Sequence, residues 1–110
     1  MSALSDASAE LQDIAEFYGY DAQSRQLIEE MAELTQALNK FWRKDMNCGK
    51  SIPILNTTSE QWVHIAEEIA DVKICLEQVE YLLQCGWLVD RYVDEKIDRQ
   101  LQSIKDGDTE

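Results

Sequence analysis

The chain has 110 residues, which is enough for one domain with a hydrophobic core and too few for two. Its 22 acidic and 10 basic residues give a net charge of −12, which argues against a nucleic-acid-binding protein, because such proteins need a basic surface. A phosphorylated small molecule is not excluded, since a bound divalent cation can reverse the local sign of the charge. The sequence has no signal-peptide pattern and no uncharged stretch near the ~18 residues of a membrane span, and its three cysteines form no C-x-x-C pair. We therefore expect a cytoplasmic protein that binds neither nucleic acid nor membranes.

Apolar residues recur at helical spacing in four segments, and the few glycines and the single proline separate them. The first predicted helix ends at Gly19, where a residue with positive φ can cap it. The second has Asp21 as its N-cap and runs over about residues 22–44. Residues 45–58 contain the proline and two asparagines, and they predict a loop.

The third predicted helix begins after Thr58, which forms a capping box with Gln61, and it ends at Gly86. The fourth runs over about residues 88–105, with a regular apolar stripe. No segment alternates with a period of two residues, so no strand is expected. The sequence thus predicts a single all-α domain over residues 1–110, with a four-helix bundle-like fold.

Four acidic residues lie at the margins of the apolar stripes of the second and third predicted helices. An advance of ~100° per residue places Glu30 and Glu33 at the edge of one stripe, and Glu68 and Asp71 in or beside the other. Carboxylates three residues apart can converge on one ligand, and burying them is costly unless they are paired or bind a metal. Oxygen ligands favour Mg²⁺, with Mn²⁺ as the alternative. The single histidine, His64, does not follow a glutamate by three residues, so a di-iron site is not expected.

The segments EEMAE at 29–33 and EEIAD at 67–71 resemble the paired E-x-x-E and E-x-x-D motifs of the MazG-like all-α nucleotide pyrophosphohydrolases. The resemblance extends from the second to the fourth predicted helix, and in that superfamily the motifs lie on two adjacent helices and bind Mg²⁺. The metal ligands that it implies are Glu30, Glu33, Glu68 and Asp71. The residue that orients or deprotonates the attacking water would be Glu67 or Glu29.

The resemblance also implies an activity and an assembly. The expected reaction is hydrolysis of a (deoxy)nucleoside triphosphate to the monophosphate and pyrophosphate, by attack at the α-phosphorus. The expected assembly is a homodimer or homotetramer, which also follows from the few helices that one chain has to enclose both a core and an acidic cleft. The 34 residues between Glu33 and Glu68 are more than many members have, which leaves the substrate preference open. Alternative functions are a phosphoribosyl-ATP pyrophosphohydrolase of the same superfamily and a non-catalytic helical interaction protein.

Three polar residues of the fourth predicted helix are candidates for substrate binding. Tyr92, Lys96 and Arg99 recur at i, i+4 and i+7, away from the apolar stripe. They can form a solvated edge or a triphosphate clamp, in which arginine supplies a planar fork and lysine a point charge. MazG-like enzymes are similar in carrying basic residues on this helix.

The ends of the predicted loop offer three further candidates. Trp42 and Trp62 flank the loop, where each can cover the core or stack on a base. His64 lies one helical turn before Glu68, on the same side, and can contact a base, support the metal or be a partly buried histidine with satisfied hydrogen bonds. Basic residues that could reach phosphates from here are Arg43, Lys44 and Lys50.

Overall fold

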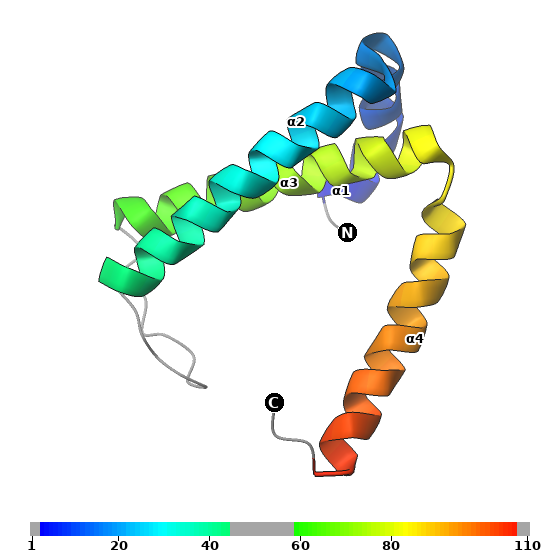
Figure 1. The fold of residues 1–110 in the computed structure, drawn as a ribbon. Helices are drawn as coiled ribbons and strands as arrows, with labels where there is room; N and C mark the ends of the chain where they lie inside the picture. Colours follow the sequence, from blue (N-terminus) through cyan, green and yellow to red (C-terminus); the bar gives the residue numbers. More distant parts are fainter. Residues whose placement is uncertain (1–2, 45–58, 108–110) are drawn as a thin grey trace.

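The structure, a computed structural model, describes residues 3–44 and 59–107, and within these ranges it contains helices and no strand. The helices are α1 (Ala3–Asp6), α2 (Ser8–Lys44), α3 (Glu60–Leu83) and α4 (Gly86–Lys105), as Figure 1 shows. The predicted all-α class is therefore confirmed. The predicted loop at 45–58 lies outside the described residues.

The long helix α2 is interrupted at Gly19. This residue has φ 85° and ψ 171°, which is a backbone conformation open to glycine and strained for other residues. A break of the first helix at Gly19 was predicted, and it is confirmed. The prediction that Asp21 is an N-cap was wrong, because Gly19 alone departs from helical geometry within α2 and the helix resumes before Asp21.

Both ends of α3 differ from the prediction by a few residues. Its N-cap is Ser59 and not Thr58: the backbone of Ser59 is extended, and its hydroxyl accepts a hydrogen bond of 3.5 Å from the Trp62 amide. The helix ends at Leu83, after which Gln84 adopts the left-handed conformation expected of a C-cap glycine. Gly86 does not end α3; it is the first residue of α4.

Helices α2 and α3 run antiparallel and side by side along a seam (Figure 1). The buried residues of the described part of the chain belong to these two helices. Few apolar side chains are buried in the described part of the chain, and most of them are small. They are Leu11, Ala15, Ala37 and Cys75. Polar residues are buried beside them, including Gln23 and Gln78, whose side-chain amides form a hydrogen bond of 2.5 Å between Nε2 and Oε1.

Helix α4 leaves the end of α3 and extends away from the α2–α3 pair (Figure 1). It makes no extensive contact with the other described helices, and none of its residues is buried. The predicted four-helix bundle is therefore not closed within one chain. In the described part of the chain, no helix combines the length and the apolar character needed to cross a membrane.

Candidate metal centre

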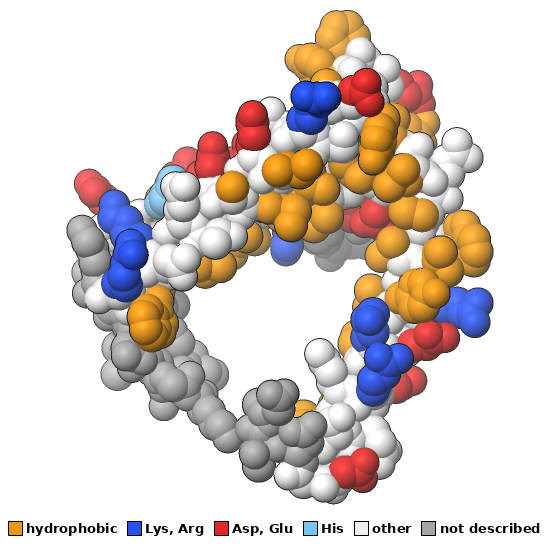
Figure 2. Space-filling view, in the orientation of Figure 1, with side chains coloured by type: hydrophobic (Ala, Val, Ile, Leu, Met, Phe, Trp, Pro, Cys, Tyr) orange, Lys and Arg blue, Asp and Glu red, His pale blue; other side chains and the backbone are white. Residues whose placement is uncertain are grey.

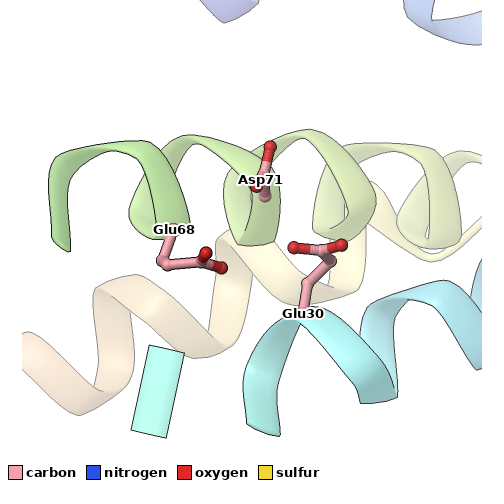
Figure 3. Close-up of side chains that lie close together, drawn as sticks. All are labelled: Glu30, Glu68 and Asp71. Atoms are coloured by element: carbon pink, nitrogen blue, oxygen red, sulfur yellow. The ribbon is translucent and has the colours of Figure 1, made fainter. Parts of the chain in front are cut away.

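Three carboxylates from the two helices of the seam lie close together. Glu30 projects from α2, and Glu68 and Asp71 project from α3, as Figure 3 shows. One carboxylate oxygen of each residue lies within 4.8 Å of the others. The spacing of three residues places Glu68 and Asp71 on one face of α3, and the antiparallel packing brings α2 to the same face. This arrangement brings together three of the four acids that the sequence predicted as metal ligands.

The three carboxylates differ in their exposure to solvent. Glu68 is only 7% exposed, Glu30 is half-buried and Asp71 is exposed. The Oε2 atoms of Glu30 and Glu68 are both buried and have no hydrogen-bond partner. A buried carboxylate oxygen without a partner is costly, and a divalent cation bound by these carboxylates would offset that cost. The residues present therefore fit a hard cation, with the exposed Asp71 on the open side.

The electrostatics of Glu30 show the repulsion within the cluster. Burial raises the pKa of the Glu30 carboxyl above its usual value, and the negative charges of Glu33 and Asp71 raise the pKa further. A hydrogen bond of 2.7 Å, donated by Gln26 Nε2 to Glu30 Oε1, acts in the opposite direction and lowers this pKa. A cation at the cluster would remove the repulsion and favour the ionised form.

One buried thiol next to the cluster was not singled out from the sequence. Cys75 follows Asp71 by one helical turn on α3, and this spacing was the signal that could have identified it. Burial raises the pKa of the Cys75 thiol, and the charges of Glu30 and Asp71 add to the effect. Cys75 is therefore a neutral neighbour of the acidic cluster.

The remaining acids of the two motifs lie on the exposed surface. Glu33 is outside the group of converging oxygens, although its charge acts on Glu30. Glu29 and Glu67, the candidates for the residue that acts on water, are both exposed. Each precedes a cluster residue by one position, so its side chain points about 100° away from that residue around the helix axis.

His64 connects the acidic cluster to a cavity. Its Nε2 lies 3.7 Å from Glu68 Oε1, and its side chain is 55% exposed. The cavity is open, has a volume of about 340 Å³ and lies between the second half of α2 and the first turns of α3. The residues that line it are Ala37, Lys40, Glu60, Gln61 and His64. Lys40 was missed in the sequence, and it provides a positive charge in the same cavity as His64.

The other predicted substrate-binding residues are not gathered at this cluster in a single chain. Tyr92, Lys96 and Arg99 are exposed on α4, which packs against neither α2 nor α3. Trp42 is 59% exposed at the end of α2, and Trp62 is half-buried in the first turn of α3. Arg43 is exposed, whereas Lys50 and the side chain of Lys44 lie outside the described part of the chain.

Comparisons of the chain with protein-family models, with curated proteins and with solved structures found no match.

Proposed function

We propose that the chain is a Mg²⁺-dependent pyrophosphohydrolase of the MazG-like type, which converts a (deoxy)nucleoside triphosphate to the monophosphate and pyrophosphate. The observation that carries the proposal is the convergence of Glu30, Glu68 and Asp71, two of which have buried oxygens without a partner. These are residues of the two acidic motifs that resemble the superfamily. Bound at these carboxylates, Mg²⁺ would offset charge on the phosphates and activate a water molecule.

The roles of the protein's own residues follow from their exposure. Glu30 and Glu68 hold the cation from the buried side of the site, and Asp71 holds it at the solvent edge, where substrate can enter. Glu29 or Glu67, both exposed beside the cluster, orients the attacking water or accepts its proton. Glu33 adds negative charge that strengthens cation binding without direct contact.

The cavity beside the cluster supports a nucleotide-sized substrate. Lys40 supplies a positive charge for a phosphate, and His64 lies between the cavity and Glu68. Trp42 and Trp62, at the adjoining ends of α2 and α3, supply aromatic surface on which a base can stack. The volume of about 340 Å³ is at the lower end of the range of small-molecule sites.

A second candidate is a non-catalytic helical interaction protein, and one observation favours it. The apolar stripe of α4 is exposed from Val93 to Ile104, as in proteins that bind a partner through one helix. This candidate leaves the two unpartnered carboxylate oxygens of the seam without an explanation. We therefore place it second, and we propose that the enzyme is also a homo-oligomer.

The test is a substrate panel assayed with and without Mg²⁺ or Mn²⁺. The panel contains canonical and damaged ribo- and deoxyribonucleoside triphosphates together with phosphoribosyl-ATP. We expect metal-dependent release of pyrophosphate, and no orthophosphate as first product, from at least one compound. Orthophosphate as the first product would contradict attack at the α-phosphorus. No turnover across the panel, and no heat of Mg²⁺ binding by calorimetry, would favour the interaction protein.

A further inference from the structure

A glutamine on α2 holds one of the two oxygens of a carboxylate in the acidic cluster. Gln26 lies one helical turn before Glu30, and its Nε2 donates a hydrogen bond of 2.7 Å to Glu30 Oε1. The other oxygen, Glu30 Oε2, is buried and has no hydrogen-bond partner. Since Oε1 already has a donor, Oε2 is the oxygen of Glu30 that still needs a donor or a positive group.

The buried glutamate of α3 has a similar arrangement. His64 lies one turn before Glu68, and its Nε2 is 3.7 Å from Glu68 Oε1, which is a close contact but longer than a hydrogen bond. Glu68 is 7% exposed, and its Oε2 is buried without a partner. The side chains of Glu30 and Glu68 each point toward the opposite helix (Figure 3). Both carboxylates therefore keep Oε1 near a side chain of the preceding turn and leave Oε2 without a partner.

A second glutamine–carboxylate pair, on α4, shows that such a hydrogen bond alone does not mark a ligand site. Gln102 Nε2 donates to Asp106 Oδ1 at 3.0 Å, again across one helical turn. This pair lies toward the end of α4, away from the α2–α3 pair (Figure 2). Asp106 is exposed, so water can satisfy its other oxygen. The pair at Gln26 is distinguished by a buried second oxygen and by the neighbouring carboxylates of Glu68 and Asp71.

The number of oxygens that a carboxylate offers distinguishes two common hard cations. Mg²⁺ requires near-octahedral geometry with short bonds, and it usually keeps several water ligands beside one or two carboxylates. Ca²⁺ takes about six to eight oxygen ligands in flexible geometry and often binds a carboxylate through both oxygens. Binding through both oxygens of Glu30 would require the hydrogen bond from Gln26 to be given up. The hydrogen-bonded carboxylate is therefore better suited to Mg²⁺ or Mn²⁺ than to Ca²⁺.

We infer that Gln26 is a positioning residue that sets the cation selectivity of the cluster, because it holds Glu30 as a ligand through Oε2 alone. The hydrogen bond fixes the rotation of the Glu30 carboxylate, so that a small octahedral cation meets a preformed ligand. Ca²⁺ does not obtain the second oxygen from it. The inference rests on the cation site of the proposed function, and it assigns a role to a residue outside both acidic motifs.

The experiment measures cation affinities of the full chain with Mn²⁺, whose free ion gives an electron paramagnetic resonance signal that is lost on binding. Mg²⁺ and Ca²⁺ are then titrated as competitors. Gln26→Ala should weaken the binding of Mn²⁺ and Mg²⁺ by about 10-fold or more, as is typical when the hydrogen-bond partner of a metal ligand is removed. Ca²⁺ binding should weaken less, because Glu30 can then offer both oxygens. The ratio of the Mg²⁺ affinity to the Ca²⁺ affinity should therefore fall.

Two further variants separate the hydrogen bond from charge and from effects on the helix. Gln26→Arg keeps a donor and adds a positive charge, so it should lower the affinity for all three cations and leave the Mg²⁺/Ca²⁺ ratio near that of the wild type. Gln102→Ala removes the same kind of bond from α4, and it should change neither the affinities nor the ratio. Circular dichroism and thermal melts without metal should show an unchanged fold for all three variants.

The outcomes separate this inference from the proposed function. An unchanged Mg²⁺/Ca²⁺ ratio in Gln26→Ala would overturn the inference alone, whether the two affinities stay the same or fall together. A ratio in Gln26→Arg as low as that in Gln26→Ala would also overturn it. A wild type that binds none of the three cations would contradict the inference and the proposed function together. The expected ratios without release of pyrophosphate from any nucleotide would support the inference and contradict the proposed activity.

Discussion

The seam between α2 and α3 and the free helix α4 have the same hydrophobic pattern and opposite surroundings. Both carry apolar residues at helical spacing, but the seam buries side chains and α4 buries none. The seam also encloses polar groups, namely the Gln23–Gln78 pair and the carboxylate of Glu68. A periodic apolar stripe thus indicates which side of a helix packs against another surface. The polar groups buried between two packed helices indicate the function of that helix pair.

Within the seam itself, buried polar groups of two kinds occur, those with a hydrogen-bond partner and those without one. The amides of Gln23 and Gln78 satisfy each other and fix how α2 lies along α3. The Oε2 atoms of Glu30 and Glu68 have no partner, so their burial costs stability in the absence of a ligand. The first pair is explained by the fold alone, and the second points to a bound cation.

The largest expected effect comes from neutralising the acids of the seam. Glu68→Gln and Asp71→Asn should each reduce turnover to the limit of detection while the helical fold is retained. Mg²⁺ should raise the melting temperature of the wild type by mass action and leave that of both variants unchanged. Without metal, Glu68→Gln should be more stable than the wild type, because the repulsion among the three neighbouring carboxylates is reduced. Steady-state assays and thermal melts with and without Mg²⁺ measure these effects.

The matched control is Glu77→Gln, which removes one charge from an exposed position of the same helix. It should keep the activity and the Mg²⁺-dependent shift of the melting temperature. Near-normal turnover in Glu68→Gln or Asp71→Asn would show that these residues are not metal ligands. The α2–α3 seam would then be a packed helix pair without a metal site.

A smaller effect is expected from the buried amide pair. Gln78→Leu leaves the Gln23 amide in the seam without a partner, which should lower the free energy of unfolding by about 1–3 kcal/mol. The double variant Gln23→Leu/Gln78→Leu should recover much of this loss, because no polar group is then left unsatisfied. Urea denaturation of both single variants and the double variant forms the cycle. If the single variants lose nothing, the pair does not hold the seam together.

The comparison also separates what the sequence could predict from what it could not. Helical periodicity predicted four helical segments, the break at Gly19 and the acidic residues of the seam, because these depend on local geometry alone. Cap positions were less accurate: Thr58 and Ser59 can both cap α3, and Ser59 is the cap because its hydroxyl reaches the Trp62 amide. Such a choice depends on backbone angles that the residue types leave open.

Features that require two helices to meet were outside the reach of periodicity. Gln23 and Gln78 are 55 residues apart and carry no motif, so their pairing follows only from how α2 and α3 lie against each other. Lys40 is a candidate for phosphate binding only because it lines a cavity together with His64, and this too depends on how α2 and α3 lie against each other. The stripe of α4 predicted a buried side, but the periodicity of one helix gives no information on which chain provides its cover.

The smallest expected effect on stability belongs to α4, where Arg99→Ala and Lys96→Ala should change substrate binding without changing the fold. Both side chains are exposed and lie off the apolar stripe, so their removal should shift the free energy of unfolding by no more than about 0.5 kcal/mol.

Arg99→Ala should raise KM about 10-fold or more, since a hydrogen bond between charged groups contributes about 1.5–3 kcal/mol. It should also lower kcat if its fork contacts charge that develops at the α-phosphorus. Lys96→Ala should act more mildly, because a lysine presents a point charge and no fork. Steady-state kinetics beside thermal melts measure both. Unchanged KM in both variants would make this side of α4 a solvated edge and shift the phosphate contacts to Lys40 and Arg43 near the cavity.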